Sequence, residues 1–211
     1  MREKKKTVKL LFILMVVFLV LLGCSLVLTS EDDAAIEEDN GLVENESYIN
    51  RASEHLALGN LELALEYFED AIFHEEELAL AWRGVGLIRF DQQDFLGARQ
   101  ALETSLELGG IETEVIYNVL GVSAMRTSDY SGAITFFDLG IALIDRENIE
   151  NTENIENIKA METLQSMMHN RIVAYQQLSD WSGAREAARE YLQIFPDDDV
   201  VQREYEFLRT R

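Results

Sequence analysis

Alanine recurs in this chain at a spacing that constrains the fold more than any other feature. Ala64 and Ala98 are 34 residues apart, and Ala133 follows after another 35. Each of these three has a large apolar residue three positions before it and another four positions after it, and residues at these offsets share one face of an α-helix. Ala184 follows Trp181 in the same way. The pattern predicts a series of similar helical units, in which each alanine marks the contact between two helices.

These units resemble the tetratricopeptide repeat (TPR) family from about residue 45 to the end of the chain. Members of the family are built from 34-residue helix pairs, and small residues stand where the two helices touch. The residues that carry the packing signature here are Ala64, Trp82, Gly86, Ala98, Tyr117, Gly121, Ala133 and Ala184. The resemblance implies an all-α fold, a right-handed superhelical solenoid of about four helix pairs with a C-terminal capping helix.

The spacing also suggests where each repeat begins and ends. We expect a domain at 45–211 with repeats at 45–78, 79–112, 114–147 and 165–198, an insertion at 148–164 and a capping helix at 200–208. Much of the insertion repeats every three residues, and a three-residue period drifts around a 3.6-residue helix. We therefore interpret the insertion as a solvated loop or an extended helix end. The alternative is a lobe that contacts a partner.

The only long apolar stretch of the chain, Leu10 to Leu28, directly follows a cluster of basic residues. Residues 1–28 therefore indicate a signal peptide or a membrane anchor. The segment Leu21-Leu22-Gly23-Cys24 resembles the lipobox of bacterial lipoproteins, which implies lipid attachment at Cys24. The alternative is an uncleaved transmembrane helix, because 19 residues without a charge are just long enough to span a bilayer. Residues 29–44 are acidic and lack helical spacing, so we expect a disordered tether there.

Charge and orientation limit where such a protein acts and what it binds. The basic flank of the apolar stretch favours the cytoplasm, so we expect a cell-membrane protein whose repeats lie outside the cytoplasm. The chain has a net charge of −21 at pH 7, and such a surface repels nucleic acid and anionic headgroups. The single cysteine allows no internal disulfide, so packing must stabilise the fold.

No catalytic or metal-binding motif stands out in the sequence. The three histidines, His55, His74 and His169, fall in separate expected helices without a nucleophile motif. His74 and Glu75 begin a pattern found in zinc proteases, but Leu78 stands where the second histidine is required. Neither a phosphate-binding glycine loop nor a nucleophile elbow is found. We predict a non-catalytic protein without a cofactor or a metal site.

The resemblance implies a concave groove lined by the first helix of each repeat. Carried over position by position, the candidate groove residues are Leu80, Arg83, Leu87, Phe90, Val115, Asn118, Val122, Met125, His169 and Val173. This set lacks the combination of lysine, asparagine and arginine with which chaperone-binding members hold a terminal carboxylate, so we do not expect that role. A mainly apolar groove with an acidic rim suits a helix or an extended segment with basic flanks, and Phe90 and Met125 are the candidate anchors. Alternatively, the insertion or the acidic tether fills the groove.

Three functions are compatible with this organisation. The first is a membrane-anchored adaptor that holds another envelope or secreted protein near the membrane. The second is an assembly or pilotin-type lipoprotein of a secretion or pilus machine. The third is a cation- or ligand-binding protein that uses its acidic surface.

Overall fold

The computed structural model describes residues 47–144 and 155–211 of the 211-residue chain. The described residues belong to one compact unit, Asn45–Arg211. The expected anchor, the lipid attachment site Cys24, the acidic tether and residues 148–154 of the expected insertion therefore lie outside the described residues.

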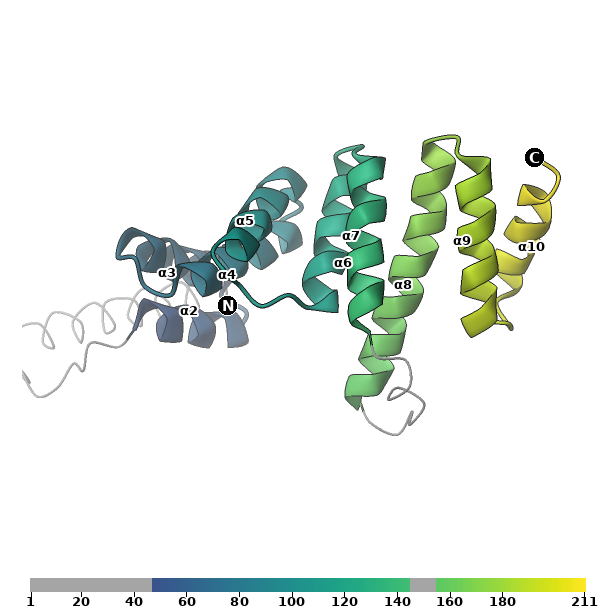
Figure 1. The fold of residues 1–211 in the computed structure, drawn as a ribbon. Helices are drawn as coiled ribbons and strands as arrows, with labels where there is room; N and C mark the ends of the chain where they lie inside the picture. Colours follow the sequence, from purple (N-terminus) through teal and green to yellow (C-terminus); the bar gives the residue numbers. More distant parts are fainter. Residues whose placement is uncertain (1–46, 145–154) are drawn as a thin grey trace, which may run out of the picture. The chain divides into compact units, whose positions relative to one another are not determined.

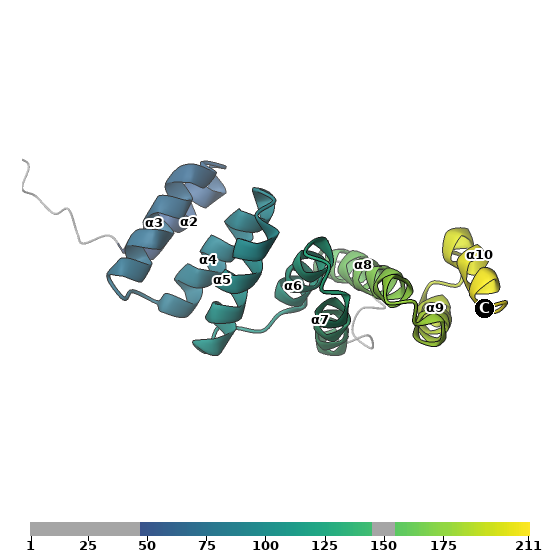
Figure 2. The same ribbon diagram turned by 90° about the horizontal axis from the view of Figure 1, so that it is seen from above.

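The described residues fold into nine α-helices, and no strand occurs among them, so the all-α prediction is confirmed (Figure 1). The helices are α2 (Tyr48–Ala57), α3 (Leu61–Phe73), α4 (Leu78–Asp91), α5 (Phe95–Glu107), α6 (Glu114–Arg126), α7 (Tyr130–Leu143), α8 (Ile155–Gln177), α9 (Trp181–Ile194) and α10 (Asp199–Leu208). Each helix packs against the next along the chain, and the tightest contacts join α2 to α3, α4 to α5, α6 to α7 and α8 to α9. The view from above shows these helix pairs in succession (Figure 2).

A short sequence pattern explains why the second helix of three pairs begins where it does. An aspartate is followed three residues later by a glycine, and its Oδ1 atom accepts a hydrogen bond from that glycine's backbone N–H. This is the usual way to cap a helix N-terminus. The N···O distances are 3.0 Å for Asp94–Gly97, 2.9 Å for Asp129–Gly132 and 2.9 Å for Asp180–Gly183. A Cβ on any of these glycines would come within 2.7 Å of the aspartate Oδ2 atom, so a larger residue there would shift the capping carboxylate.

The recurring alanines lie where the sequence analysis expected helix contacts. Ala64, Ala98, Ala133 and Ala184 are all completely buried. The glycines of the first helices meet large side chains of the second helices. A Cβ on Gly86 would lie 2.6 Å from Cγ of Leu102. Small residues therefore set the close approach of the two helices within a pair.

Two arginines join neighbouring pairs through ion pairs. Arg99 of α5 contacts Asp129 at the start of α7, with an Nη1···Oδ2 distance of 2.6 Å. Arg171 of α8 contacts Asp138 of α7 at 2.6 Å and Glu190 of α9 at 2.5 Å. The Arg171 side chain is only 11% exposed, so its two ion pairs lie in a partly desolvated setting. Such pairs fix the register between repeats more firmly than fully exposed pairs do.

Helix α10 closes the C-terminal end of the stack, as the expected capping helix would. The Tyr191 hydroxyl donates to Asp198 Oδ2 at 2.6 Å and accepts from Gln165 Nε2 at 2.9 Å. Asp198 in turn caps α10 by accepting from the N–H groups of Val200 and Val201. Burial, followed by the hydrogen bond to Asp198, raises the pKa of Tyr191 to about 12. The hydroxyl thus stays protonated at neutral pH and links α8, α9 and the start of α10.

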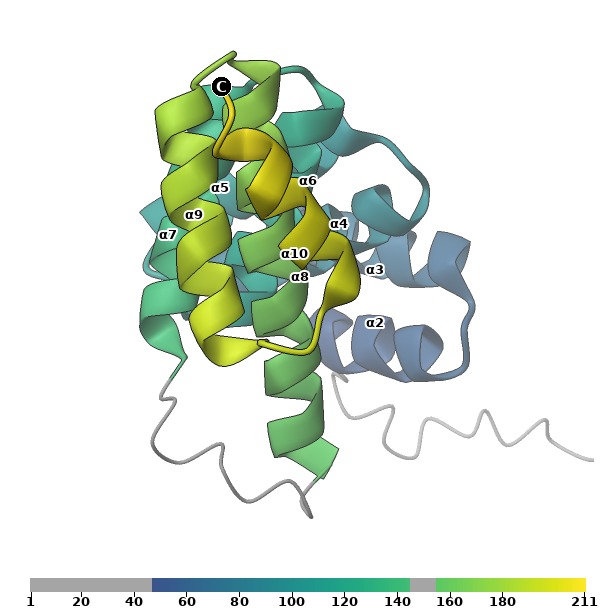
Figure 3. The ribbon, with the colours of Figure 1, turned by 90° about the vertical axis from the view of Figure 1, so that its right-hand side faces the viewer.

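Helix α8 is the longest helix and begins inside the segment expected to be an insertion. It runs over 23 residues from Ile155, so residues 155–164 are helical and continuous with the first helix of the last pair. Its first turns extend past the adjoining end of α9 (Figure 3). Ile155 and Ile158 are exposed in these turns.

Candidate binding groove

The ten candidate groove residues lie on α4, α6 and α8, three first helices that contact one another in that order. Nine of the ten are half-buried, and the tenth, Val115, is exposed. Four lie on α4 (Leu80, Arg83, Leu87, Phe90), four on α6 (Val115, Asn118, Val122, Met125) and two on α8 (His169, Val173). Because none is fully buried, a partly accessible row of side chains follows α4 and α6.

Several of these side chains also pack in the core. Leu87 and Phe90 pack against the cluster that contains Leu102 and Leu120, while Met125 packs against the cluster that contains Phe137. From the sequence, Phe90 and Met125 were candidate anchors, and a core role for some of the groove residues was left open. The structure adds a packing role, because each side chain stands at the edge of the contact between neighbouring helices.

One hollow lies at the C-terminal end of α4 and has a volume of about 370 Å³. The rings of Phe90 and Phe95 meet edge to face with centroids 5.7 Å apart, and Val122 lies opposite them on α6. The Arg126 guanidinium lies 5.5 Å from the centre of the Phe95 ring. The hollow therefore combines aromatic surface with one cation, Arg126, and one carboxylate, Asp91.

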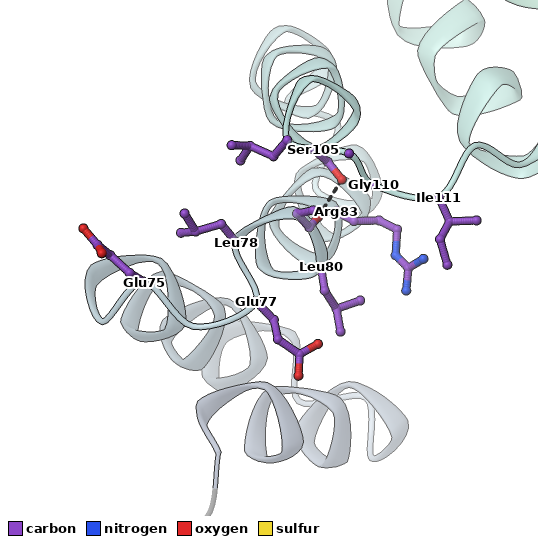
Figure 4. Close-up of a pocket in the computed structure, with 11 residues that line it drawn as sticks. Glu75, Glu77, Leu78, Leu80, Arg83, Ser105, Gly110 and Ile111 are labelled. Atoms are coloured by element: carbon purple, nitrogen blue, oxygen red, sulfur yellow. Dashed lines mark hydrogen bonds between the residues drawn. The ribbon is translucent and has the colours of Figure 1, made fainter.

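A larger pocket of about 600 Å³ lies at the other end of α4 (Figure 4). It is formed by the loop before α4, the first turns of α4, the end of α5 and the loop that follows. The lining residues are Glu75, Glu77, Leu78, Ala79, Leu80, Arg83, Ser105, Leu108, Gly109, Gly110 and Ile111. Ser105 Oγ donates to the Ala79 carbonyl at 2.6 Å and so holds the end of α5 against the start of α4.

Arg83 differs from the other arginines of this region in its electrostatic setting. Arg89 contacts Glu69, and Arg99 contacts both Glu103 and Asp129. Within the described ranges, the Arg83 side chain has no hydrogen bond and no ion pair. Arg83 is half-buried as a residue, and its guanidinium with five N–H donors therefore lines the pocket without a partner among the described residues.

Comparison with known proteins establishes the type of fold. The family model of the tetratricopeptide repeat matches residues 49–110, which is less than a third of the chain and covers most of α2 to α5. The crystal structure of MamA protein superimposes with a TM-score of 0.59 over 76% of this chain and 78% of MamA, at 14% identity. The fold is a tetratricopeptide-repeat solenoid.

Two further matches agree with the TPR fold over parts of larger molecules. The Cut9–Hcn1 hetero-tetramer of the APC/C gives a TM-score of 0.51 at 18% identity, over 76% of this chain and 29% of that one. A heat-shock protein cognate (HSC) co-chaperone, sgt12 of Aspergillus fumigatus, is 39% identical over 61 residues, or 29% of this chain. The match spans only 18% of the co-chaperone. These similarities agree with a TPR-type fold.

At the C-terminal end of the TPR stack, α10 limits the groove. Gln176 of α8 donates from Nε2 to Glu204 Oε1 of α10 at 2.6 Å. The hydrogen bond from Tyr191 first, and the nearby His169 to a smaller extent, lower the pKa of Asp198. His169 is thus close to Asp198 at the start of the capping helix.

The groove positions carried over from the TPR family did not include the loop that completes the larger pocket. Leu108, Gly109, Gly110 and Ile111 stand between α5 and α6, outside those helical positions. Gly109 has a φ of +83°, and a Cβ on Gly110 would lie 2.6 Å from Ser105 Oγ. The sequence feature that could have indicated this loop is the Gly109-Gly110 pair, which directly precedes Ile111. The Ile111 side chain is 68% exposed.

Among residues 47–144 and 155–211, no helix is both long and apolar enough to cross a bilayer. The same ranges hold no group of three histidine, cysteine or acidic side chains arranged to bind a metal ion.

Proposed function

We propose that this protein is a membrane-anchored adaptor that binds a segment of another protein in its TPR groove, outside the cytoplasm. TPR proteins generally mediate protein–protein interaction. The observation that carries the proposal is the row of partly accessible side chains on α4 and α6, with a pocket near each end of α4.

The bound segment is an extended peptide or one face of a helix. Both can insert apolar side chains at regular spacing into a groove formed by helices. Phe90 and Val122 offer such contacts at one pocket, and Leu80 offers them at the other. The partner is an envelope or secreted protein, because the proposed anchor places the groove on that side of the membrane.

The anchor in this proposal is the apolar stretch Leu10 to Leu28. Its basic flank, its length and the single Cys24 after Gly23 support a lipoprotein signal, and an uncleaved transmembrane helix remains the second form of the proposal. Metabolic labelling with an alkyne fatty acid distinguishes the two. If the protein is labelled and the Cys24→Ser variant is not, the result supports the lipoprotein. Unlabelled protein in the membrane supports the transmembrane helix. Protein found only in the cytoplasm contradicts both forms.

The groove is tested by affinity capture from crosslinked membranes. The bait is the full-length anchored chain, compared with its Phe90→Ala/Met125→Ala variant. We expect recovery of the partner to fall by more than tenfold, because both side chains line the groove. Since both also pack in the core, the thermal unfolding of each variant must be measured alongside.

A matched control removes similar apolar surface outside the groove. Phe73 of α3 and Leu139 of α7 are exposed and belong to second helices. The Phe73→Ala/Leu139→Ala variant should recover the partner as well as the parent chain does. Equal recovery by all three baits, or equal loss in both variants, would contradict the assignment of the groove.

A further inference from the structure

We infer that the pocket at the start of α4 selects a partner segment in which an acidic side chain is adjacent to an apolar one, with Arg83 binding the carboxylate. This inference rests on the proposed function and specifies the chemistry of its partner. It also departs from the sequence-based expectation, which considered only basic flanks. The central observation is the juxtaposition of an unpaired arginine with an apolar pocket.

Arg83 is one of several arginines without an ion pair among the described residues, and it lines the pocket. The chain has 39 acidic residues against 18 lysines and arginines. Even so, within the part of the chain that the structure describes, none contacts Arg83. Its guanidinium extends toward Ile111 at the pocket wall (Figure 4). A carboxylate reaching it can accept two parallel hydrogen bonds, the geometry that arginine favours most.

The apolar half of the pocket is next to this cation. Leu78 and Leu80 come from α4, and Leu108 and Ile111 come from the end of α5 and the loop after it. Leu108 and Ile111 are exposed, so their apolar surface is free to be covered. An apolar partner side chain that fills the pocket also removes water from the Arg83 guanidinium, and an ion pair is stronger in the less polar setting that results.

The acidic residues of the pocket determine which charge the other end of the partner segment carries. Glu77 stands before the first turn of α4, and Figure 4 shows its carboxylate on the same side of the pocket as Leu80. Arg83 and Glu77 are not within ion-pair distance of each other. The pocket therefore presents negative charge, apolar surface and positive charge in sequence. A complementary segment carries a basic, an apolar and an acidic residue in matching order, and its net charge need not be negative.

Peptide selection tests this inference directly. A phage-displayed library of random 12-residue peptides is selected on the full-length chain in lipid nanodiscs, after depletion on empty nanodiscs. We expect enrichment of peptides with aspartate or glutamate adjacent to an apolar residue, at least fivefold above the starting library. Arg83→Glu should abolish the acidic preference, and Arg83→Lys should retain part of it, because lysine keeps the charge but not the bidentate geometry.

Arg185→Glu is the matched control. Arg185 belongs to α9, outside the groove helices, and like Arg83 it has no ion pair among the described residues. This variant should select the same peptides as the parent chain. The inference is overturned if the enriched peptides lack acidic residues or if their acidic preference survives Arg83→Glu. If folded protein enriches no peptide at all, the groove itself is refuted, and the proposed function fails together with the inference.

Discussion

Gly121 of α6 lies so close to Phe137 of α7 that a Cβ on the glycine would be 2.4 Å from Cε1 of the ring. Phe137 is completely buried and comes four residues after Ala133, the alanine of the same repeat. Phe68 of α3 makes a similar contact with α4 of the next pair, where a Cβ on Gly84 would be 2.4 Å from the ring. Aromatic side chains of second helices thus pack directly on the backbone of first helices.

This contact predicts that Gly121→Ala destabilises the protein. Overpacking a core typically costs about 1 to 3 kcal/mol, while the better helix propensity of alanine offsets about 1 kcal/mol. We therefore expect a lower free energy of unfolding, measured by urea denaturation with tryptophan fluorescence. Adding Phe137→Leu should relieve the clash, so the double variant should lose less than the sum of the single losses. Strict additivity would show that the two residues do not interact.

The pH dependence of stability should reflect Glu76, which ties the loop before α4 to the start of α2. Its carboxylate accepts hydrogen bonds from Ser47 Oγ and from the N–H groups of Tyr48 and Ile49. The hydrogen bond from Ser47 is the main cause that lowers the pKa of Glu76 from its ordinary value of 4.5. A carboxyl whose pKa is lower in the folded state stabilises the fold above pH 4.5, and this stabilisation is lost as the pH falls through the lowered pKa.

Glu76→Gln should therefore be less stable than the parent chain at pH 7, and the difference should shrink as the pH falls below about 4. Free energies of unfolding measured at pH 7, 5, 4 and 3 check this. Glu75→Gln is the control, because the exposed Glu75 side chain makes no such helix cap. A difference between the Glu76 variant and the parent that is the same at every pH would contradict the explanation.

Arg171 and Arg189 both form ion pairs but differ in burial, so their contributions to stability can be compared. The Arg171 side chain is 11% exposed and contacts carboxylates on α7 and α9, whereas the Arg189 side chain is 56% exposed and contacts Glu186 on its own helix. Replacing one partner of a partly buried ion pair lowers the free energy of unfolding more than replacing one partner of an exposed pair. Arg171→Met should lower the free energy of unfolding by about 1 to 3 kcal/mol, and Arg189→Met by less than about 1 kcal/mol. Equal losses would argue against a role of Arg171 in joining the repeats.

Local sequence patterns were sufficient for much of the fold. The buried alanines at Ala64, Ala98 and Ala133 and the capping aspartates lie within short segments, so their spacing reveals helix contacts and helix starts before any tertiary structure is known. The capping helix was visible in the same way, because its apolar positions follow Pro196 at helical spacing.

The pocket at the start of α4 was not predictable in this way. It depends on how the loop 108–113 passes the first turns of α4, and no periodic pattern describes that approach. The groove positions carried over from the TPR family included Leu80 and Arg83 but not Ile111. Nor could they show that Arg83 lacks a carboxylate partner, because ion pairs between helices depend on side-chain positions in space. The packing of Phe90 on Phe95 was missed for the same reason.

Site-specific photocrosslinking in native membranes tests the central claim most directly. A photoreactive benzoylphenylalanine replaces Val115, a groove residue that is 47% exposed, or Leu139, which is 44% exposed on α7 outside the groove. The account predicts a discrete crosslinked partner from position 115 and none from position 139. The same products from both positions, or no product from position 115, would contradict the proposal that this groove holds the partner.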